Sequence, residues 1–499
     1  MSNEKPSSAK KVLINSGIYS ITSIFQKAIG FILLPLYTLY LTPQDYGIVG
    51  VVNSLTAVLT LLFTFSLNSA VQRYYYRYRE NWEQLKSFYG TIMIFILLNS
   101  CLLGGIIVLL KDILIEPFIS SIAFYPYIFM GVLTVIVNPI YTIYQTLLQT
   151  MERAKTYAIN SLLNFAMMVT CNILFIVIFQ WGASGQLMSY LLTGLTFGVY
   201  SLVSLYQQDI ISFRFNKSYL KEALTYSVPL LPHLMSTQIA DFVSRLFLNN
   251  QVSTASAGLY TTASQFMLII DTIQYSVNSA YVPWFYSLMD MGGKEKEKAI
   301  QFTDILSRLY LLISLGMAFF IKEVIQIFIH PSYLLAWTLV PVILIAYQIR
   351  SIYLFYVNTL FYNTKATRFI FLATLSGSLL SVFLSATLTQ VLGLMTPAVV
   401  LLLQWMLTTG IVYLLSRKIE PVDFKIKRLL GYVGILILGS GMGLFYDICH
   451  PEGPLMWQNF LYKVVLYLMI AFLLLHRDLP TLKAMAQNML KHKKEGSKA

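Results

Sequence analysis

Charged residues are scarce in this 499-residue sequence. Asp, Glu, Lys and Arg together make up 11% of the chain, whereas hydrophobic residues make up 57%. Soluble domains usually carry about 25% charged residues. The composition therefore excludes an ordinary soluble protein and indicates an integral membrane protein.

Cysteine is also rare, and the sequence lacks the usual signatures of metal and nucleotide sites. Cys101, Cys171 and Cys449 lie in or beside apolar runs, are odd in number and form no spaced set, so they are predicted to be packing residues. The five histidines are scattered. The motif G-x-x-x-x-G-K-[ST] is missing, because Gly293 and Lys294 are followed by Glu295, and ATP hydrolysis is therefore not expected.

Long polar segments are missing as well. Every segment that connects two apolar runs is short, so the chain has no room for an extramembrane catalytic domain. A polymerase or ligase of polysaccharides would need a sizeable outer loop with catalytic side chains. We therefore predict that the protein is not an enzyme and that it uses no cofactor.

The chain instead contains about fourteen apolar runs of roughly 20 residues, the length that crosses a bilayer as a helix. The second of these runs is predicted as residues 47–69 and the seventh as residues 223–248. The predicted fold is an all-α polytopic membrane protein. The N-terminal segment leads into the first run without a small-residue cleavage site, which indicates a membrane span rather than a signal peptide. This first span, residues 12–41, is over-long and contains Pro35, so it should tilt or kink.

Lys and Arg are distributed unevenly between the two sides of these spans. Of the 35 Lys and Arg residues, 29 lie at the N-terminus, in the segments after even-numbered spans and in the C-terminal tail. Only Lys111 and Lys463 lie on the other side. This asymmetry predicts that both termini are in the cytoplasm. Cations spread in this way do not form a nucleic-acid surface, and the basic tail is expected to contact membrane lipid.

An internal repeat divides the chain. Residues 66–76, SLNSAVQRYYY, match residues 276–286, SVNSAYVPWFY, at an offset of 210. Tyr46-Gly47-Ile48 is echoed by Ala257-Gly258-Leu259 at an offset of 211. We therefore predict two six-span halves, 1–215 and 216–428, two additional spans within 429–475 and a basic cytoplasmic tail, 476–499. Transporters that are built from parallel repeats of this kind bind their substrates in a cavity between the two halves.

Four short sequence features resemble those of a known family. They are Asn15-x-x-x-Tyr19, Gly30-Phe31 with Pro35, the segment LTPQDYGIVG at 41–50, and Pro229-x-x-Pro232 with Asp241. With the two six-span halves, they resemble the Wzx-type polysaccharide flippases of the multidrug/oligosaccharidyl-lipid/polysaccharide (MOP) exporter superfamily. The resemblance implies transfer of undecaprenyl-pyrophosphate-linked oligosaccharide across the bacterial inner membrane, through a cationic cavity between two bundles.

Residues 226–250 are the most informative stretch for a cavity. His233, Thr237, Asp241 and Arg245 recur at i, i+4, which places four polar groups on one face of an apolar helix. Ionisable groups at membrane depth normally face a bundle interior or an aqueous cavity. Asp241 and Arg245 can pair with each other, and a neutralising pair and a functional site remain open as explanations.

Three other ionisable residues lie near the middle of spans. Lys27 precedes Gly30-Phe31 at a place where related lipid II flippases carry Arg, so it is a candidate contact for pyrophosphate, with snorkelling as the alternative. Arg350, flanked by Tyr347 and Tyr353, is a second candidate because a central Arg has few structural explanations. Asp271 either binds H⁺ or Na⁺ for coupling or pairs with a cation across the cavity.

Two further groups of charges have simpler explanations. Lys322 and Glu323, at the outer end of a span, are predicted to be interfacial. Arg73, Arg77 and Arg79 interleave with tyrosines at the cytoplasmic end of the second span. They either load a lipid-linked saccharide at the cytoplasmic mouth of the cavity or, more simply, form an aromatic belt with orienting cations.

The sequence therefore predicts a flippase for lipid-linked oligosaccharide in the bacterial cytoplasmic membrane. Its expected partners are this substrate, membrane lipids, and the polymerase and chain-length machinery of surface polysaccharide. The candidate substrate contacts are Lys27, Arg245 and Arg350, and the candidate coupling residues are Asp241 and Asp271. An ion-coupled multidrug exporter on the same fold remains the main alternative, and a polymerase or ligase is the other.

Overall fold

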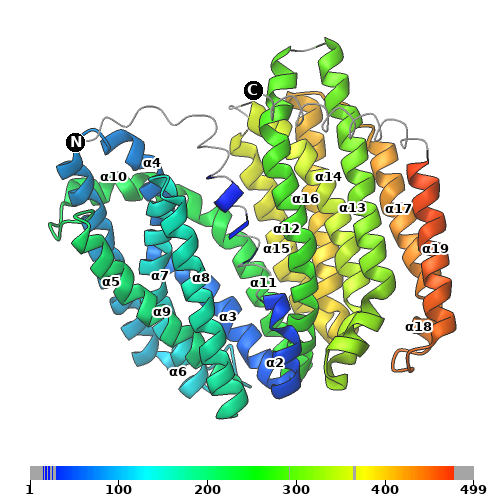
Figure 1. The fold of residues 1–499 in the computed structure, drawn as a ribbon, viewed down its shortest axis with the longest axis horizontal. Coiled ribbons are helices and arrows are strands. Elements are labelled where there is room, and N and C mark those ends of the chain that lie inside the picture. The colour runs from blue at the N-terminus through cyan, green and yellow to red at the C-terminus, as the bar shows by residue number, and fades with distance from the viewer. Residues whose placement is uncertain are drawn as a thin grey trace, which may run out of the picture.

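The computed structural model describes residues 15, 17–19, 21–22, 25, 30–291, 293–363 and 367–476. Within these ranges every element of secondary structure is helical, and the helices form two bundles that stand side by side (Figure 1). We call α2–α9 the N-terminal half and α11–α16 the C-terminal half. The all-helical fold predicted from the sequence is confirmed.

The N-terminal half contains seven α-helices longer than four residues and two π-helical turns among the described residues. Their bounds are α2 Leu34–Tyr40, α3 Pro43–Thr64, α4 Leu67–Tyr78, α5 Trp82–Leu109, the short α6 Lys111–Leu114, η1 Phe124–Ile128, α7 Phe129–Thr150, α8 Ala154–Asn172, η2 Ile173–Ile178 and α9 Gly182–Gln207. In this half α7 packs against α3, α5 and α9, which places it at the centre of the bundle.

The C-terminal half follows a connecting helix, α10. The bounds are α10 Lys217–Ser227, η3 Val228–Leu230, α11 Leu231–Gln251, α12 Thr254–Met291, α13 Gly293–Phe328, η4 Pro331–Thr338, α14 Val340–Tyr362, α15 Thr367–Leu392, η5 Gly393–Met395 and α16 Thr396–Ile419. Two additional helices, α17 Ile426–Gly443 and α19 Trp457–Leu475, flank α13 on the outer edge, with the short α18 Phe445–Cys449 between them (Figure 1).

The length and composition of these helices fit a membrane protein. Ten helical stretches in the described ranges are long and apolar enough to cross a bilayer, and one of them, Phe369–Ile419, includes both α15 and α16. Helices α11 and α12 run beside these stretches and carry the polar side chains that the sequence placed in the cavity wall. The protein is a multi-pass membrane protein, as predicted.

Two of the predicted spans are interrupted by breaks in the helix. A turn at Leu33 interrupts the first span and precedes α2, which has Pro35 in its first turn. The second span, predicted as residues 47–69, ends at Thr64, because Phe65 and Ser66 adopt left-handed conformations with φ of 47° and 55°. Helix α4 then begins at a new angle.

The predicted start of the seventh span at residue 223 is wrong. Residues 217–227 form α10, which carries Lys217, Lys221 and Glu222 and packs against α4 and α5 of the N-terminal half. The turn η3 follows, and α11 then begins at Leu231 with Pro232 in its first turn. The prolines separate a charged surface helix from the membrane helix, since neither can donate the backbone hydrogen bond that would continue the first helix.

The two halves meet where α3 packs along α12. A Cβ atom on Gly47 would lie 1.9 Å from the Thr254 carbonyl oxygen, and one on Gly258 would lie 1.8 Å from the Pro43 carbonyl oxygen. Only glycine permits this approach of two backbones. The contact is symmetric, because Pro43 and Thr254 are separated by the same 211 positions as Gly47 and Gly258. We call this the glycine contact.

An apolar core that both halves share surrounds the glycine contact. Leu34, Tyr37 and Tyr46 from the N-terminal half pack with Phe266 and Tyr333 from the C-terminal half. The Tyr333 hydroxyl donates to the Leu41 carbonyl oxygen at 2.8 Å, and the rings of Phe31 and Phe266 make an edge-on contact at 5.5 Å. The halves are therefore closed against each other at this end of the molecule.

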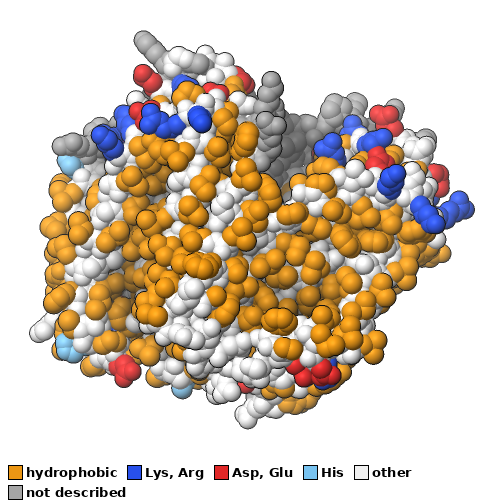
Figure 2. All heavy atoms as spheres, turned by 180° about the vertical axis from the view of Figure 1, so that it is seen from behind, with side chains coloured by type: hydrophobic (Ala, Val, Ile, Leu, Met, Phe, Trp, Pro, Cys, Tyr) orange, Lys and Arg blue, Asp and Glu red, His pale blue; other side chains and the backbone are white. Residues whose placement is uncertain are grey.

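The exposed charges separate the two ends of the molecule. Lys and Arg gather at one end, shown at the top of Figure 2, and a broad hydrophobic belt separates it from the other end. We call these the basic end and the opposite end, and the glycine contact lies toward the opposite end. There the Lys111 ammonium pairs with Asp112 at 2.6 Å and Glu116 at 2.7 Å, and these hydrogen bonds raise the pKa of Lys111 above its ordinary value, so that it stays charged.

Helices α17 and α19 are attached to α13 by polar contacts at both ends. Near the basic end, Asp304 of α13 pairs with Arg308 at 3.0 Å and accepts from the Tyr432 hydroxyl of α17 at 2.8 Å. Arg308 in turn donates to the carbonyl oxygen of Leu474 in α19 at 3.2 Å. The additional helices are thereby bound firmly to the C-terminal half.

Candidate functional site

Besides the Asp304–Arg308 pair near the basic end, two arginine–aspartate pairs lie inside the C-terminal half. Asp241 and Arg245 are one turn apart on α11, and the Arg245 Nε donates to Asp241 Oδ2 at 3.1 Å. Asp271 of α12 and Arg350 of α14 form the second pair, with 2.6 Å between Arg350 Nη1 and Asp271 Oδ1. The charges that the sequence placed in the membrane are thus neutralised in pairs, which lowers the cost of burying them.

Arg245 uses all three of its nitrogens within the protein. Besides the Nε contact with Asp241, Nη1 donates to Thr261 Oγ1 at 2.8 Å and Nη2 donates to Ser264 Oγ at 3.2 Å. The guanidinium also lies over the ring of Tyr260, 4.8 Å from its centroid, and the side chain is only 10% exposed. These bonds bind α11 to α12, so the geometry gives Arg245 a structural role.

Arg350 is held differently. Its contacts with Asp271 and with Gln274 Oε1, at 3.3 Å, both use Nη1. The guanidinium lies between the rings of Tyr347 and Trp405, 5.0 and 5.4 Å from their centroids. Nε and Nη2 donate to none of the residues that the structure describes. Of the two alternatives predicted for Asp271, the structure therefore shows pairing with a cation, and the Nε and Nη2 of Arg350 keep their donor capacity toward other groups.

The two pairs belong to one wall. Tyr347 lies within electrostatic range of Asp241, Asp271 and Arg350, and its carbonyl oxygen accepts from Gln274 Nε2 at 2.8 Å. The polar face predicted for α11 does not line this wall along its whole length, since the His233 Nδ1 is 2.9 Å from Thr374 Oγ1 of α15. The charged wall is therefore made by α11, α12 and α14 together.

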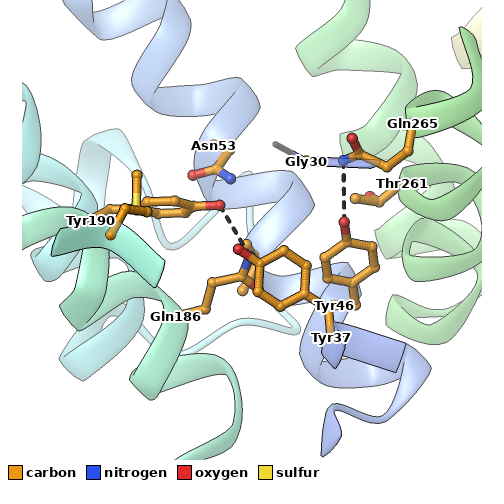
Figure 3. Close-up of a pocket in the computed structure, with 10 residues that line it drawn as sticks. Gly30, Tyr37, Tyr46, Asn53, Gln186, Tyr190, Thr261 and Gln265 are labelled. Carbon is orange, nitrogen blue, oxygen red and sulfur yellow. Dashed lines mark hydrogen bonds between the residues drawn. The ribbon is translucent and has the colours of Figure 1, made fainter. Parts of the chain in front are cut away.

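A central pocket of about 160 Å³ lies between the halves (Figure 3). Thr261 and Gln265 reach it from α12, Asn53 and Tyr46 from α3, and Tyr190 from α9. The Gln265 Nε2 donates to the Tyr46 hydroxyl at 3.1 Å across the interface. On the N-terminal side the Gln186 Nε2 donates to the Tyr190 hydroxyl at 3.0 Å. Because Thr261 also accepts from Arg245, the pocket adjoins the charged wall.

A larger pocket of about 530 Å³ lies within the N-terminal half, between α3, α7, α8 and α9. It shares Asn53, Met168 and Tyr190 with the central pocket. This pocket was not predicted from the sequence, because the predicted site residues were charged residues alone. A signal was available: Thr134, Asn138 and Thr142 recur at i, i+4 within an apolar run, which places them on one helical face.

The arginines predicted at the cytoplasmic mouth contact helix α10. Arg77 pairs with Glu222, which also accepts from the Tyr78 hydroxyl. Arg73 lies over the ring of Tyr226 at 4.7 Å, and Arg79 lies 5.7 Å from the ring centroid of Tyr76, on its own helix. This arrangement fastens α4 to α10. A role for the three arginines in loading substrate remains a prediction.

Two other charged sites of the sequence analysis have different outcomes. Lys27 lies outside the described residues. The prediction of an interfacial Lys322–Glu323 pair is wrong, because both side chains are buried near the opposite end. Glu323 Oε1 and Asp447 Oδ2 each lie 2.5 Å from the Lys463 Nζ, and Lys322 donates to the His450 carbonyl oxygen at 2.6 Å. We call Lys322, Glu323, Asp447 and Lys463 the buried charge cluster.

Comparison with known families bears on this arrangement. The model of the polysaccharide biosynthesis protein family matches residues 12–289, which include α2–α11 and most of α12. This chain belongs to that family. The resemblance inferred from the sequence is thereby confirmed, and membership supports a role in transport rather than in catalysis.

Individual relatives are distant but cover most of the chain. "Lsg locus putative protein 1" of Haemophilus influenzae is 23% identical over 367 residues, which are 71% of this chain and 86% of that protein. A structure of the lipid II flippase MurJ in an inward closed conformation superposes with a TM-score of 0.70 at 14% identity, covering 92% of this chain and 99% of that one.

A multidrug resistance MATE family transporter of the MOP superfamily is also similar. Its inward-facing structure gives a TM-score of 0.58 at 13% identity, covering 81% of this chain and 96% of that one. At such identities the similarity establishes the fold alone. The polysaccharide family member described here has the MOP transporter fold.

Proposed function

We propose that this protein is a flippase that moves undecaprenyl-pyrophosphate-linked oligosaccharide from the cytoplasmic to the periplasmic leaflet of the bacterial cytoplasmic membrane, for surface polysaccharide synthesis. The observation that carries the proposal is the state of Arg350. Arg350 lies in the middle of α14, and Asp271 balances its charge. Its Nε and Nη2 donate to none of the described residues. Family membership supports the same class of substrate.

The guanidinium of Arg350 suits a phosphate group. Arginine binds phosphate through two parallel N–H donors, and such charge-assisted bonds are shorter and stronger than neutral ones. The rings of Tyr347 and Trp405 fix the plane of the guanidinium, so little side-chain entropy is lost when phosphate binds. Without substrate, Asp271 is the counterion of Arg350. Phosphate then replaces Asp271 at the guanidinium or binds beside it, so Arg350 always has an anionic partner in the membrane.

The electric field across the membrane favours this direction of transport. A pyrophosphate carries roughly two negative charges, and each charge gains about 2.3 kcal/mol per 100 mV when it moves outward across a membrane that is negative inside. Coupling to H⁺ or Na⁺ is a further part of the proposal. Either ion would bind at Asp241 or Asp271 and compete with the arginine that holds that carboxylate.

The substrate preference separates this proposal from a drug exporter. A cationic drug needs an uncompensated carboxylate, whereas the Asp241 and Asp271 carboxylates each pair with an arginine. The lipid tail of the proposed substrate remains in the bilayer. The polymerase and chain-length machinery are the proposed partners on the outer side, where the saccharide is released.

Transport in purified vesicles tests the proposal. Vesicles would contain the protein and lipid-linked oligosaccharide isolated from cells that lack it, and an added lectin would report the saccharide on the outer leaflet. Wild-type protein should equilibrate the two leaflets. Arg350→Ala should slow the transfer about tenfold or more, because a hydrogen bond to a charged group contributes about 1.5–3 kcal/mol, and Arg350→Lys should retain part of the rate.

The exposed Lys418 at the basic end provides a matched control. Lys418→Ala removes one positive charge outside the site and should leave the rate unchanged. Transfer by wild-type protein no faster than in protein-free vesicles would contradict the proposed function. Equal transfer rates for wild-type protein and Arg350→Ala would show that Arg350 does not bind the substrate.

The proposal also places the basic end in the cytoplasm, and cysteine labelling in intact cells checks it. In a background with Cys101, Cys171 and Cys449 changed to serine, Ser218→Cys in the first turn of α10 should resist a membrane-impermeant maleimide. Ser120→Cys, in the loop before η1, should react, because it lies at the opposite end and both serines are exposed. Labelling of the first and protection of the second would reverse the orientation.

A further inference from the structure

The pocket of about 530 Å³ in the N-terminal half has an uncharged polar lining. Its walls include Asn53, Thr56, Thr134, Asn138 and Asn164, and none of the described residues that line it is Asp, Glu, Lys or Arg. Its volume falls within the range of about 300–1,000 Å³ typical of small-molecule sites. A pocket of this size and composition is unusual in a membrane bundle, where polar groups without a purpose are costly.

The hydroxyl groups of this lining are oriented by the helices. Thr56 Oγ1 donates to the Asn53 carbonyl oxygen at 2.8 Å, and Thr134 Oγ1 donates to the Met130 carbonyl oxygen at 2.8 Å. Since each hydroxyl has one donor and two acceptor lone pairs, its remaining capacity is to accept. The amides of Asn138 and Asn164 supply both donors and acceptors. Together these groups match a ligand with many hydroxyls.

The position of this pocket relates it to the charged wall. It meets the central pocket at Asn53, Met168 and Tyr190. The central pocket in turn reaches Thr261, which accepts from Arg245. A polar route therefore leads from the N-terminal half to the arginine–aspartate pairs. One half has charges that bind an anion, and the other has neutral groups that bind hydroxyls.

We infer that the pocket in the N-terminal half is a carbohydrate subsite, which binds the saccharide of the substrate while the C-terminal half binds its phosphate. The inference rests on the proposed function and adds a division of recognition between the halves. It also fits the neutral lining that the described residues give this pocket: a neutral saccharide gains nothing from an ion pair, and a cation there would compete with Arg350 for the phosphate.

Ligand binding to purified protein separates the two subsites. The probes are undecaprenyl pyrophosphate without sugar and the lipid-linked oligosaccharide that accumulates in cells lacking the protein. Wild-type protein should bind the saccharide-bearing lipid more tightly. Asn138→Leu and Asn164→Leu should each reduce that advantage about fivefold to tenfold, as expected when a buried hydrogen bond to the ligand is lost, and should leave the affinity for the bare lipid unchanged.

A filled pocket gives an independent test. Ala57 lines the pocket and is half-buried, so Ala57→Phe should occupy the space of the saccharide and abolish its contribution to affinity. Ala166→Phe is the matched control, because Ala166 is exposed on α8 and its side chain lies on a different face from the lining residues Asn164 and Met168. This control should bind both lipids as the wild type does.

The outcomes distinguish the subsite from the proposed function. Equal affinity of the wild type for the two lipids, or an unchanged preference in Ala57→Phe and in the asparagine variants, would overturn the carbohydrate subsite and leave the flippase intact. Failure of the wild type to bind either lipid would overturn both.

Discussion

Gly258→Ala is expected to reduce export at least about a hundredfold while the protein remains in the membrane. The added Cβ would lie 1.8 Å from the Pro43 carbonyl oxygen and 2.8 Å from its carbon. Both atoms belong to the backbone and cannot rotate away. Overpacking of this kind costs about 3 kcal/mol, and about 2.7 kcal/mol already shifts a two-state equilibrium a hundredfold. The closed contact of the two halves should therefore become a minor state.

Surface labelling would show the separation directly. Ala257 is fully buried and packs against the N-terminal half, so Ala257→Cys should be protected from an impermeant maleimide in an otherwise cysteine-free protein. Adding Gly258→Ala should expose it. Gly47→Ala should act in the same way, and the two substitutions together should cost less than the sum of their effects, since both separate the same contact.

A glycine elsewhere supplies the control. Gly434 of α17 has no atom within 4 Å of a Cβ built on it, so Gly434→Ala should leave export and labelling unchanged. Normal export by Gly258→Ala would mean that transport does not pass through the closed contact between α3 and α12.

Lys463→Met should destabilise the protein more than any substitution of an exposed charge. The ammonium of Lys463 lies 2.5 Å from carboxylate oxygens of both Glu323 and Asp447, and the lysine itself is fully buried. Without it two carboxylates share an apolar site with Lys322 alone. Removing one partner of a buried ion pair costs about 3–5 kcal/mol. Helix α19 should then detach from α13, and the thermal unfolding temperature in detergent should fall.

Restoring the charge balance should recover much of that loss. The double variant Lys463→Met, Glu323→Gln retains Lys322 with Asp447 and carries no excess charge in the cluster. It should unfold at a higher temperature than Lys463→Met alone, because an uncompensated carboxylate costs more than a neutral amide. Lys427, exposed at the start of α17, is the matched control. If Lys427→Met and Lys463→Met unfold alike, the cluster does not stabilise the fold.

The architecture was predictable because the thickness and apolar character of the bilayer determine the length and composition of the helices that cross it. Apolar runs of bilayer length predicted the helices, and the i, i+4 spacing of Asp241 and Arg245 predicted their pair. The 211-residue echo of Gly47 in Gly258 predicted a repeat, but the direct contact of its two copies needed the structure. A spacing shows that two residues are equivalent and does not show that they touch.

The site was less predictable because it depends on contacts between helices that are distant in the sequence. Asp271 and Arg350 are 79 positions apart, and no periodicity connects them, so the sequence could offer a cation as the partner of Asp271 without identifying Arg350 as that cation. Lys322 and Glu323 were expected at the interface for the same reason, since Asp447 and Lys463 lie on later helices. The neutral pocket was missed because its asparagines and threonines resemble ordinary polar residues of membrane helices until four helices bring them together.

The symmetry of the glycine contact also has an evolutionary consequence. Pro43 of α3 contacts Gly258 of α12, and the equivalent Thr254 of α12 contacts Gly47 of α3. On the predicted repeat, a single six-helix ancestor would have paired with a second copy of itself, with this glycine beside the twofold axis. One substitution in that ancestor would have altered the interface twice. After fusion each half would have been free to diverge, which fits the proposed division of phosphate and saccharide binding between the two halves.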